Sequence, residues 1–369
     1  MPPTTPPIPS PLTTQLPFLT PAEIAALPYP PDALPGARDV DTFYGTMRVY
    51  EWGPEGGRKV LFVHGDATPS PIFSRVARGL VEKGLRVMLF DLWGRGYSDT
   101  PLAIRHDVRL FETQILLALA SSPLPWTKTG FSLIGFSLGG PIAMAFAGTF
   151  PHFVRSVALF APAGMLNKLP DGYDDAIMHL PPETDEVLKD EIREKVRQIL
   201  DLEPSPAPSS LLQDGPTIPT VTSTEKTPSS SSPNQDFDMH SILQWQFDQH
   251  SGHVHSFHDT VRYGPARGCE AEWRKACSII SSSALISPSS TSSSPICTTS
   301  SLHGSQLLVL FGRDDDIVNG AETTAQILEM LPREHLRTVY VPGGHGFPYP
   351  EAGRVVEALL EFFGGIDGE

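Results

Sequence analysis

The chain has 369 residues, and its 42 acidic side chains outnumber the 27 basic ones, giving a formal net charge of −15 at pH 7. This balance argues against nucleic acids and anionic membrane surfaces as partners, because both require a basic face on the protein. Three cysteines leave an odd one over and no apolar run reaches the roughly 18 residues of a membrane span, so we expect a cytoplasmic protein with reduced thiols and no membrane span.

The N-terminal 38 residues are rich in proline and threonine, and they lack the charged and apolar segments of a secretory signal. We interpret 1–38 as a flexible arm, extended or disordered, that could hold one short helix at 21–27. A pair of strands is expected next, around 42–52, and the cluster GPEGG at 53–57 marks a turn after it.

Short apolar runs then alternate with helical patterns. The runs are about five residues long, rich in Val, Leu and Phe, and not alternating, which is typical of strands in a parallel sheet covered on both faces. They lie at 59–63, 86–90, 131–134, 154–160, 307–311 and 337–341, and the helical patterns lie at 72–83, 108–121, 141–150, 321–331 and 351–363. The alternation predicts an α/β fold with a mostly parallel, doubly wound sheet of about eight strands.

The regular alternation stops near residue 165 and resumes near residue 305. Between these points, 185–200 has the pattern of an amphipathic helix, and 240–263 is expected to hold another. Two low-complexity tracts, about 203–235 and 281–301, have too little apolar content to offset their ordering entropy, so we expect disorder there. The expected division is an arm at 1–38, a core at 39–164 and 305–369, and an inserted helical cap at 165–304.

The sequence Gly135-Phe136-Ser137-Leu138-Gly139 lies just after one predicted strand and just before a predicted helix. The two glycines leave room for a tight strand-to-helix turn, which would expose the Ser137 hydroxyl at a helix N-terminus. The backbone N–H of Leu138 would then point at an oxyanion formed beside Ser137. A G-x-S-x-G sequence alone is weak evidence, and the flanking strand and helix are what make Ser137 a candidate nucleophile.

A nucleophilic serine needs a general base, and the base needs an orienting acid. In open α/β sheets the site lies at the carboxyl ends of the strands. This rule favours His345, which follows the last predicted strand, over His335, which precedes it. The loop after the preceding strand carries Asp314, Asp315 and Asp316, and the rule alone does not choose among them.

With these residues in place, the chain resembles the α/β-hydrolase superfamily, in its lid-bearing branch of esterases and lipases. The chain order Ser…Asp…His matches. The sequence HGD at 64–66 resembles the family's oxyanion loop, DLWGRGYS at 91–98 resembles its D-x-x-G-x-G-x-S loop, and GRDD at 312–315 resembles its G-x-x-D acid loop. The likeness covers about 40–163 and 304–364, and leaves out the arm and most of the cap.

The resemblance implies a serine hydrolase with Ser137 as nucleophile, His345 as base and Asp315 as the orienting acid. It also implies that the backbone N–H groups of Asp66 and Leu138 form the oxyanion hole. Position 66 is often bulky and apolar in relatives, so a carboxylate here is unusual, and we expect it to point away from the oxyanion.

Four further residues receive interpretations of their own. His64 is expected to support the oxyanion loop by hydrogen bonds, and Asp91 to accept hydrogen bonds that stabilise its turn. Phe136, beside the nucleophile, and Trp245, in the expected cap, are candidate substrate-binding residues. The histidine-rich run at 250–258 has spacings that would suit a metal site, but we interpret it as a polar cap helix, because no cysteine or paired carboxylate supports a ligand set.

The predicted reaction needs no metal and no organic cofactor. The expected substrate is a small-molecule carboxylic ester or lactone of a small to medium apolar acid, since the cap should supply a mostly apolar pocket. The same residues would also serve an acyltransferase or thioesterase, a C–C bond hydrolase, a perhydrolase, or a degenerate hydrolase acting as a binding protein. The oligomeric state is left open by the sequence.

Overall fold

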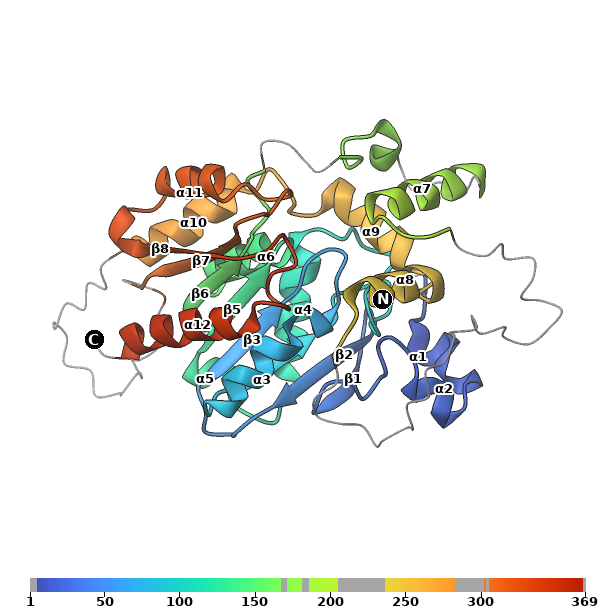
Figure 1. The fold of residues 1–369 in the computed structure, drawn as a ribbon, viewed down its shortest axis with the longest axis horizontal. Coiled ribbons are helices and arrows are strands. Elements are labelled where there is room, and N and C mark those ends of the chain that lie inside the picture. The colour runs from blue at the N-terminus through green and yellow to red at the C-terminus, as the bar shows by residue number, and fades with distance from the viewer. Residues whose placement is uncertain are drawn as a thin grey trace.

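The structure is a computed structural model, and it describes residues 5–166, 171–180, 186–204, 236–282, 302 and 305–367. The two tracts that we expected to be disordered lie almost wholly outside these residues. The described part of the chain forms a central sheet covered by helices. A second group of helices lies over the carboxyl ends of its parallel strands (Figure 1).

The sheet has eight strands in the described part of the chain, in the order β1-β2-β4-β3-β5-β6-β7-β8. The strands are β1 (Ala37–Thr42), β2 (Gly45–Trp52), β3 (Lys59–Val63), β4 (Arg86–Phe90), β5 (Phe131–Phe136), β6 (Val154–Phe160), β7 (Leu307–Gly312) and β8 (Leu336–Val341). Strand β2 pairs antiparallel with β1 and β4, and every other pairing is parallel. The predicted α/β fold with a mostly parallel, doubly wound sheet is therefore confirmed.

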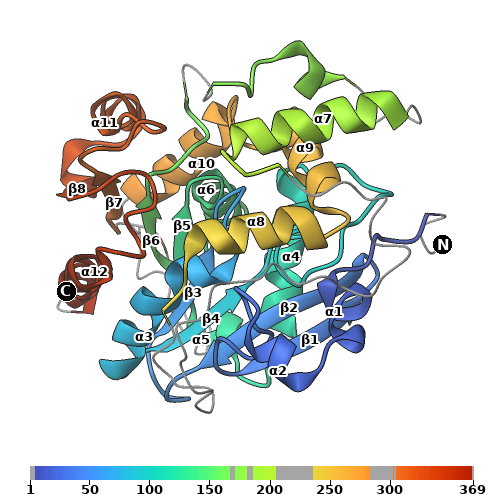
Figure 2. The same cartoon turned by 45° about the vertical axis from the view of Figure 1, so that its right-hand side comes forward.

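Helices cover both faces of this sheet (Figures 1 and 2). The core helices are α3 (Ser74–Glu82), α4 (Val108–Ala120), α5 (Trp126–Thr129), α6 (Gly139–Thr149), α10 (Glu270–Ser281), α11 (Gly320–Leu328) and α12 (Ala352–Asp367), with short 3-10 turns η2 (Ser70–Phe73) and η5 (Arg333–His335). Helix α3 packs with α12 on one face, while α4 and α10 pack against α6 on the other. Because both faces are covered, β3, β5 and β7 are buried along their whole length, which explains why their sequences are mostly apolar and do not alternate.

The N-terminal segment differs from the flexible arm that its proline content predicted. Residues 5–36 include α1 (Pro11–Thr14), η1 (Leu16–Phe18) and α2 (Pro21–Ala25). They lie beside β1 and β2, at the end of the sheet that β1 forms (Figure 2). Ile8 pairs with Thr100 across an isolated bridge, and the Tyr29 side chain is fully buried with its hydroxyl donating to Asp91 Oδ2 at 3.1 Å. Buried aromatic area and paired backbone groups offset the ordering entropy that composition alone suggested would dominate.

Three further helices lie above the carboxyl ends of the parallel strands (Figure 2). They are α7 (Glu186–Ile199), α8 (Met239–Gln249) and α9 (His253–Tyr263), with the 3-10 turn η3 (Ala176–His179) beside them. They pack around a small apolar cluster of their own, which includes Val196, Phe247 and Phe257. The single helix expected at 240–263 is therefore two helices, which meet at Gly252, where a Cβ would overlap the Thr100 side chain.

Helix α10 also falls in the range 165–304 that we expected to form the cap, yet it packs against α6 in the core layer. Its buried residues, Trp273, Ala276, Cys277 and Ile280, have the spacing of one helical face, which is the sequence signal that could have revealed it. Within the described ranges, no helix is both long enough and apolar enough to cross a lipid bilayer.

Candidate active site

Ser137 lies in a sharp turn between β5 and α6. Its φ of 51° is in the left-handed region, which is strained for a residue with a side chain. The flanking glycines have no room for a Cβ, since one at Gly135 would overlap the Gly139 carbonyl and one at Gly139 would overlap the Val63 carbonyl. The Ser137 N–H donates to Phe160 O at 2.9 Å, so the neighbouring strand β6 holds the turn in place.

The structure brings together the three residues predicted as nucleophile, base and acid. His345 Nε2 lies 3.0 Å from Ser137 Oγ, and His345 Nδ1 lies 2.9 Å from Asp315 Oδ2. Asp315 follows β7 and His345 follows β8, so both reach the serine from the carboxyl ends of adjacent strands. Since a carboxylate can only accept, Nδ1 carries the imidazole proton and Nε2 is left to accept from the serine hydroxyl.

The other oxygen of Asp315 is also satisfied. Asp315 Oδ1 accepts from the N–H groups of Ile317 at 2.9 Å and Val318 at 2.8 Å, which fixes the carboxylate plane. The side chain of Asp315 is 1% exposed, whereas Asp314 and Asp316 point into solvent. Of the three consecutive aspartates, the one that reaches the histidine is the one at the position the G-x-x-D pattern implied.

His64 supports the loop that carries Asp66. Its Nε2 accepts from Leu92 N at 2.8 Å, which leaves Nδ1 to donate to Gly65 O at 2.8 Å. Burial lowers the pKa of His64 to about 3, so the ring stays neutral in this role. The Gly65 carbonyl and the Asp66 N–H belong to one planar peptide, and a hydrogen bond that holds the carbonyl also orients the N–H.

The two expected oxyanion donors are available for a ligand. Among the described residues, the N–H groups of Asp66 and Leu138 have no hydrogen-bond acceptor. Both residues line the same cavity as Ser137, and Gly65 lies so close to Ser137 that a Cβ there would be 3.2 Å from the serine Cβ.

A cavity of about 360 Å³ opens at Ser137 and His345, between the core and the cap helices. Its walls are mostly apolar, with Ile72 and Val318 from the core and Ile199 and Leu243 from α7 and α8. Asp66, Thr68 and Tyr173 also line the cavity, and sequence reasoning did not single out the last two.

A family model described as alpha/beta hydrolase fold matches residues 59–352 of the chain. The chain belongs to the α/β-hydrolase fold family. The family resemblance that rested on the turn at Ser137, on three loop motifs and on the order of Ser137, Asp315 and His345 is therefore confirmed.

Relatives of this α/β hydrolase share only part of its length. A serine hydrolase-like protein of Danio rerio is 32% identical over 124 residues, which are 33% of this chain and 36% of the relative. A 2-hydroxy-6-oxo-2,4-heptadienoate hydrolase of Pseudomonas putida is 29% identical over 120 residues, which are 32% of this chain and 42% of the relative. The solved esterase of Exiguobacterium antarcticum superposes with a TM-score of 0.53 at 17% identity, covering 88% of this chain and 98% of that one, which shows a shared fold.

The two expected substrate-binding residues are placed differently in this α/β hydrolase. Phe136 lines the cavity, and its ring lies against the imidazole of His345 with centroids 5.0 Å apart. Trp245 does not line the cavity: its indole donates to Gln15 Oε1 at 3.0 Å and packs against Tyr29. The indole faces the N-terminal segment, for which the proline content predicts a flexible arm.

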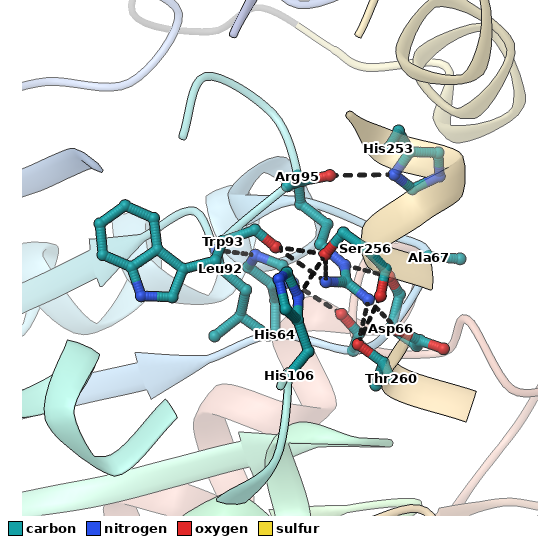
Figure 3. Close-up of polar contacts among 12 residues, drawn as sticks. His64, Asp66, Ala67, Leu92, Trp93, Arg95, His106, His253, Ser256 and Thr260 are labelled. Atoms are coloured by element: carbon teal, nitrogen blue, oxygen red, sulfur yellow. Dashed lines mark hydrogen bonds and ion pairs between the residues drawn. The ribbon is translucent and has the colours of Figure 1, made fainter. Parts of the chain in front are cut away.

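The carboxylate of Asp66 is directed at Arg95, with which it forms a buried ion pair (Figure 3). Burial raises the pKa of the Asp66 carboxyl, and the charge of Arg95 opposes that rise. The carboxylate is thus engaged by Arg95, and its turning away from an oxyanion stays a prediction. Arg95 belongs to the 91–98 motif, and its contacts could not be read from that motif.

The histidine-rich run joins the cap to the core. His250 Nε2 lies 2.8 Å from Ser98 O and His253 Nδ1 lies 3.1 Å from Gly94 O, and burial lowers the pKa of both rings. The described residues include no group of three or more side chains suited to hold a metal ion.

Asp91, at the start of the 91–98 loop, accepts from the N–H groups of Ser70 and Tyr97 at 3.0 Å each, so it supports the turn as expected.

Proposed function

We propose that this α/β hydrolase is a serine hydrolase that cleaves a carboxylic ester or lactone of a small to medium apolar substrate. The observation that carries the proposal is the position of His345, within hydrogen-bond distance of both Ser137 and Asp315 at the floor of a mostly apolar cavity. Base, nucleophile and orienting acid in this relation are the parts that acyl transfer through a serine requires.

In the proposed reaction, Ser137 Oγ attacks the ester carbonyl carbon while His345 Nε2 takes its proton. The carbonyl oxygen becomes an oxyanion, which the N–H groups of Asp66 and Leu138 stabilise. The tetrahedral intermediate collapses as His345 returns the proton to the leaving alcohol oxygen. Water, deprotonated by His345, then attacks the acyl-enzyme, and the acid is released with Ser137 restored. Asp315 keeps the imidazole in the required tautomer and stabilises its protonated form.

The size and lining of the cavity support the substrate class. A volume of about 360 Å³ is near the lower end of ligand pockets in general, which favours small to medium substrates. Leu243 and Ile199 of the cap contribute aliphatic surface to the cavity that Ser137 also lines, so an apolar acyl chain would be buried on binding.

C–C bond hydrolysis is the second candidate, because one curated relative is named as a 2-hydroxy-6-oxo-2,4-heptadienoate hydrolase. Acyl transfer to an alcohol or thiol would use the same three residues. These reactions differ in what attacks or leaves the carbonyl carbon, so substrates rather than site geometry distinguish them.

The first test is covalent labelling with a fluorophosphonate probe, which reacts with activated serines. Stoichiometric labelling that Ser137→Ala abolishes, and that the exposed Ser251→Ala leaves intact, would support an activated nucleophile. A panel of p-nitrophenyl esters of increasing chain length, a thioester and a vinylogous 1,5-diketone would then assign the reaction. An unlabelled, folded wild type would contradict the proposal and favour a binding protein.

A further inference from the structure

Arg95 is a fully buried arginine between the core and the cap (Figure 3). Its Nε donates to Asp66 O at 2.9 Å, its Nη1 to Trp93 O at 2.8 Å and its Nη2 to Thr260 Oγ1 at 3.0 Å. It also donates to the Ser256 hydroxyl and to the Asp66 carboxylate. One planar guanidinium group thus holds three segments that are far apart in the sequence.

Two of these partners belong to one face of the cap helix α9. Ser256 and Thr260 are four residues apart, which places both side chains on the side of the helix that faces the core. The helix approaches so closely that Gly94, at φ 73°, has no room for a Cβ against Ser256. Arg95 is therefore satisfied only when α9 is docked on the 91–98 loop.

Asp66, on the core side of Arg95, carries one of the proposed oxyanion donors. Arg95 binds Asp66 twice, at its carbonyl and at its carboxylate, so both the backbone and the side chain of Asp66 are restrained. His64 holds the preceding Gly65 carbonyl from the other side. The Asp66 N–H lies between these two restraints, and its direction depends on both.

Charge gives Arg95 a second effect on the same site. Asp66 lines the cavity in which an oxyanion would form, and an unpaired carboxylate there would disfavour a developing negative charge. The guanidinium group of Arg95 neutralises it at contact distance. A relative with an apolar residue at this position would have no such requirement.

We propose that Arg95 is a positioning residue that couples cap docking to the oxyanion hole. It binds the carbonyl and the carboxylate of Asp66, while Ser256 and Thr260 of α9 hold the guanidinium group. The inference rests on the proposed function, because it assigns Arg95 an effect on a step of that reaction. It predicts that loosening the α9 contact weakens transition-state stabilisation even though α9 does not touch the reacting atoms.

The test compares three variants in the full-length protein. Arg95→Lys keeps a positive charge but cannot reach Asp66, Trp93 and α9 together, because an ammonium group lacks the planar fork. Thr260→Val removes, at nearly constant volume, the hydroxyl that accepts from Arg95 and donates to Ser256 O within α9. Thr100→Val is the matched control, because the Thr100 hydroxyl is equally buried next to α9 and has no hydrogen-bond partner among the described residues.

The measurements are kcat and KM on the preferred ester, and the rate of fluorophosphonate labelling. For Arg95→Lys we expect kcat to fall about 10- to 100-fold with KM changed less than about 2-fold, since an oxyanion donor acts in the transition state and not in substrate binding. Thr260→Val should lower kcat about 3-fold, and its labelling rate in parallel, because one of several restraints is lost. Thr100→Val should leave both unchanged.

A variant with normal kcat and a raised KM would overturn the inference, because Arg95 would then serve only to dock the cap. An equal fall in Thr100→Val would also overturn it, by showing a general sensitivity of this region. If Arg95→Lys does not fold, Thr260→Val against Thr100→Val decides alone. An unreactive wild type would overturn the proposed function and this inference together, whereas a reactive wild type with fully reactive variants overturns only this inference.

Discussion

Asp315 Oδ2 and His345 Nδ1 are 2.9 Å apart, although Asp315 is flanked on both sides by aspartates that face solvent. The neighbouring N–H groups of Ile317 and Val318 bind the second carboxylate oxygen and turn this one side chain inward. Three chemically identical residues thus have different environments, and each can be tested separately.

Asp315→Asn should lower kcat for ester hydrolysis by about 10⁴-fold, because an amide that donates to Nδ1 leaves Nε2 protonated and unable to accept from Ser137. Asp314→Asn and Asp316→Asn are matched controls with the same change in charge, and they should retain nearly full activity. Steady-state kinetics on one ester substrate would measure all three. Equal losses at 315 and 316 would refute the assignment of the acid.

Gly139→Ala should abolish fluorophosphonate labelling of Ser137 and lower the melting temperature, because its Cβ would overlap the Val63 carbonyl. The control is Gly353→Ala in α12, where a Cβ meets no atom within 4 Å. Alanine should stabilise that helix by about 0.5–1 kcal/mol. Thermal unfolding and labelling would be measured on both, and a labelled, stable Gly139→Ala would contradict the tight turn.

Tyr29→Phe should destabilise the protein by about 1–3 kcal/mol, because it removes the buried hydroxyl that bonds Tyr50 and Asp91. Tyr29 does not line the cavity at Ser137, so ester kinetics should change little. Tyr340→Phe, at a half-exposed phenol, is the control for the loss of a hydroxyl. Urea unfolding would measure the difference, and equal stability of Tyr29→Phe and wild type would show that the N-terminal segment is not anchored there.

Leu243→Ala should shift the preference of kcat/KM toward longer acyl chains, because it enlarges the apolar wall of the cavity. One or two added methylenes are expected to gain about 1–2 kcal/mol relative to wild type. Trp245→Phe, on the same helix but outside the cavity, should leave the chain-length profile unchanged. A shift in Trp245→Phe and not in Leu243→Ala would restore the tryptophan as a pocket residue.

Stability should fall as pH is lowered from neutrality, because several histidines are buried in the neutral form. The pKa is lowered by burial to about 3 for His64 and His106 and to about 4 for His250. Below the unfolded value of about 6.5 the unfolded chain binds protons that the native state does not, so each ring lowers the free energy of unfolding by about 1.4 kcal/mol per pH unit until its folded pKa is reached.

Urea unfolding at pH 7, 6 and 5 would measure this slope. His250→Gln should reduce it by the share of one group, and the exposed His240→Gln is the matched control. A slope that His250→Gln does not change would show that this ring does not titrate as its burial implies.

Local sequence patterns predict most of the sheet and the loops that carry Ser137, Asp315 and His345. The central strands are mostly apolar and do not alternate because both faces of the sheet are covered, and the turn at Ser137 needs glycines on both sides. Such signals are local, since a strand pattern, a tight turn and a loop after a strand are each written in neighbouring residues. For the same reason the loops of Asp315 and His345 could be assigned to one edge of the sheet.

Only the tertiary structure decided what surrounds that site. Arg95 donates to Thr260, 165 residues further along the chain, and Trp245 donates to Gln15, 230 residues away. No periodicity or motif reports such contacts, because they depend on where the cap and the N-terminal segment pack after the sheet has formed. The packed N-terminal segment, the place of α10 in the core and the clamp on Asp66 all follow from burial between distant segments, which composition does not reveal.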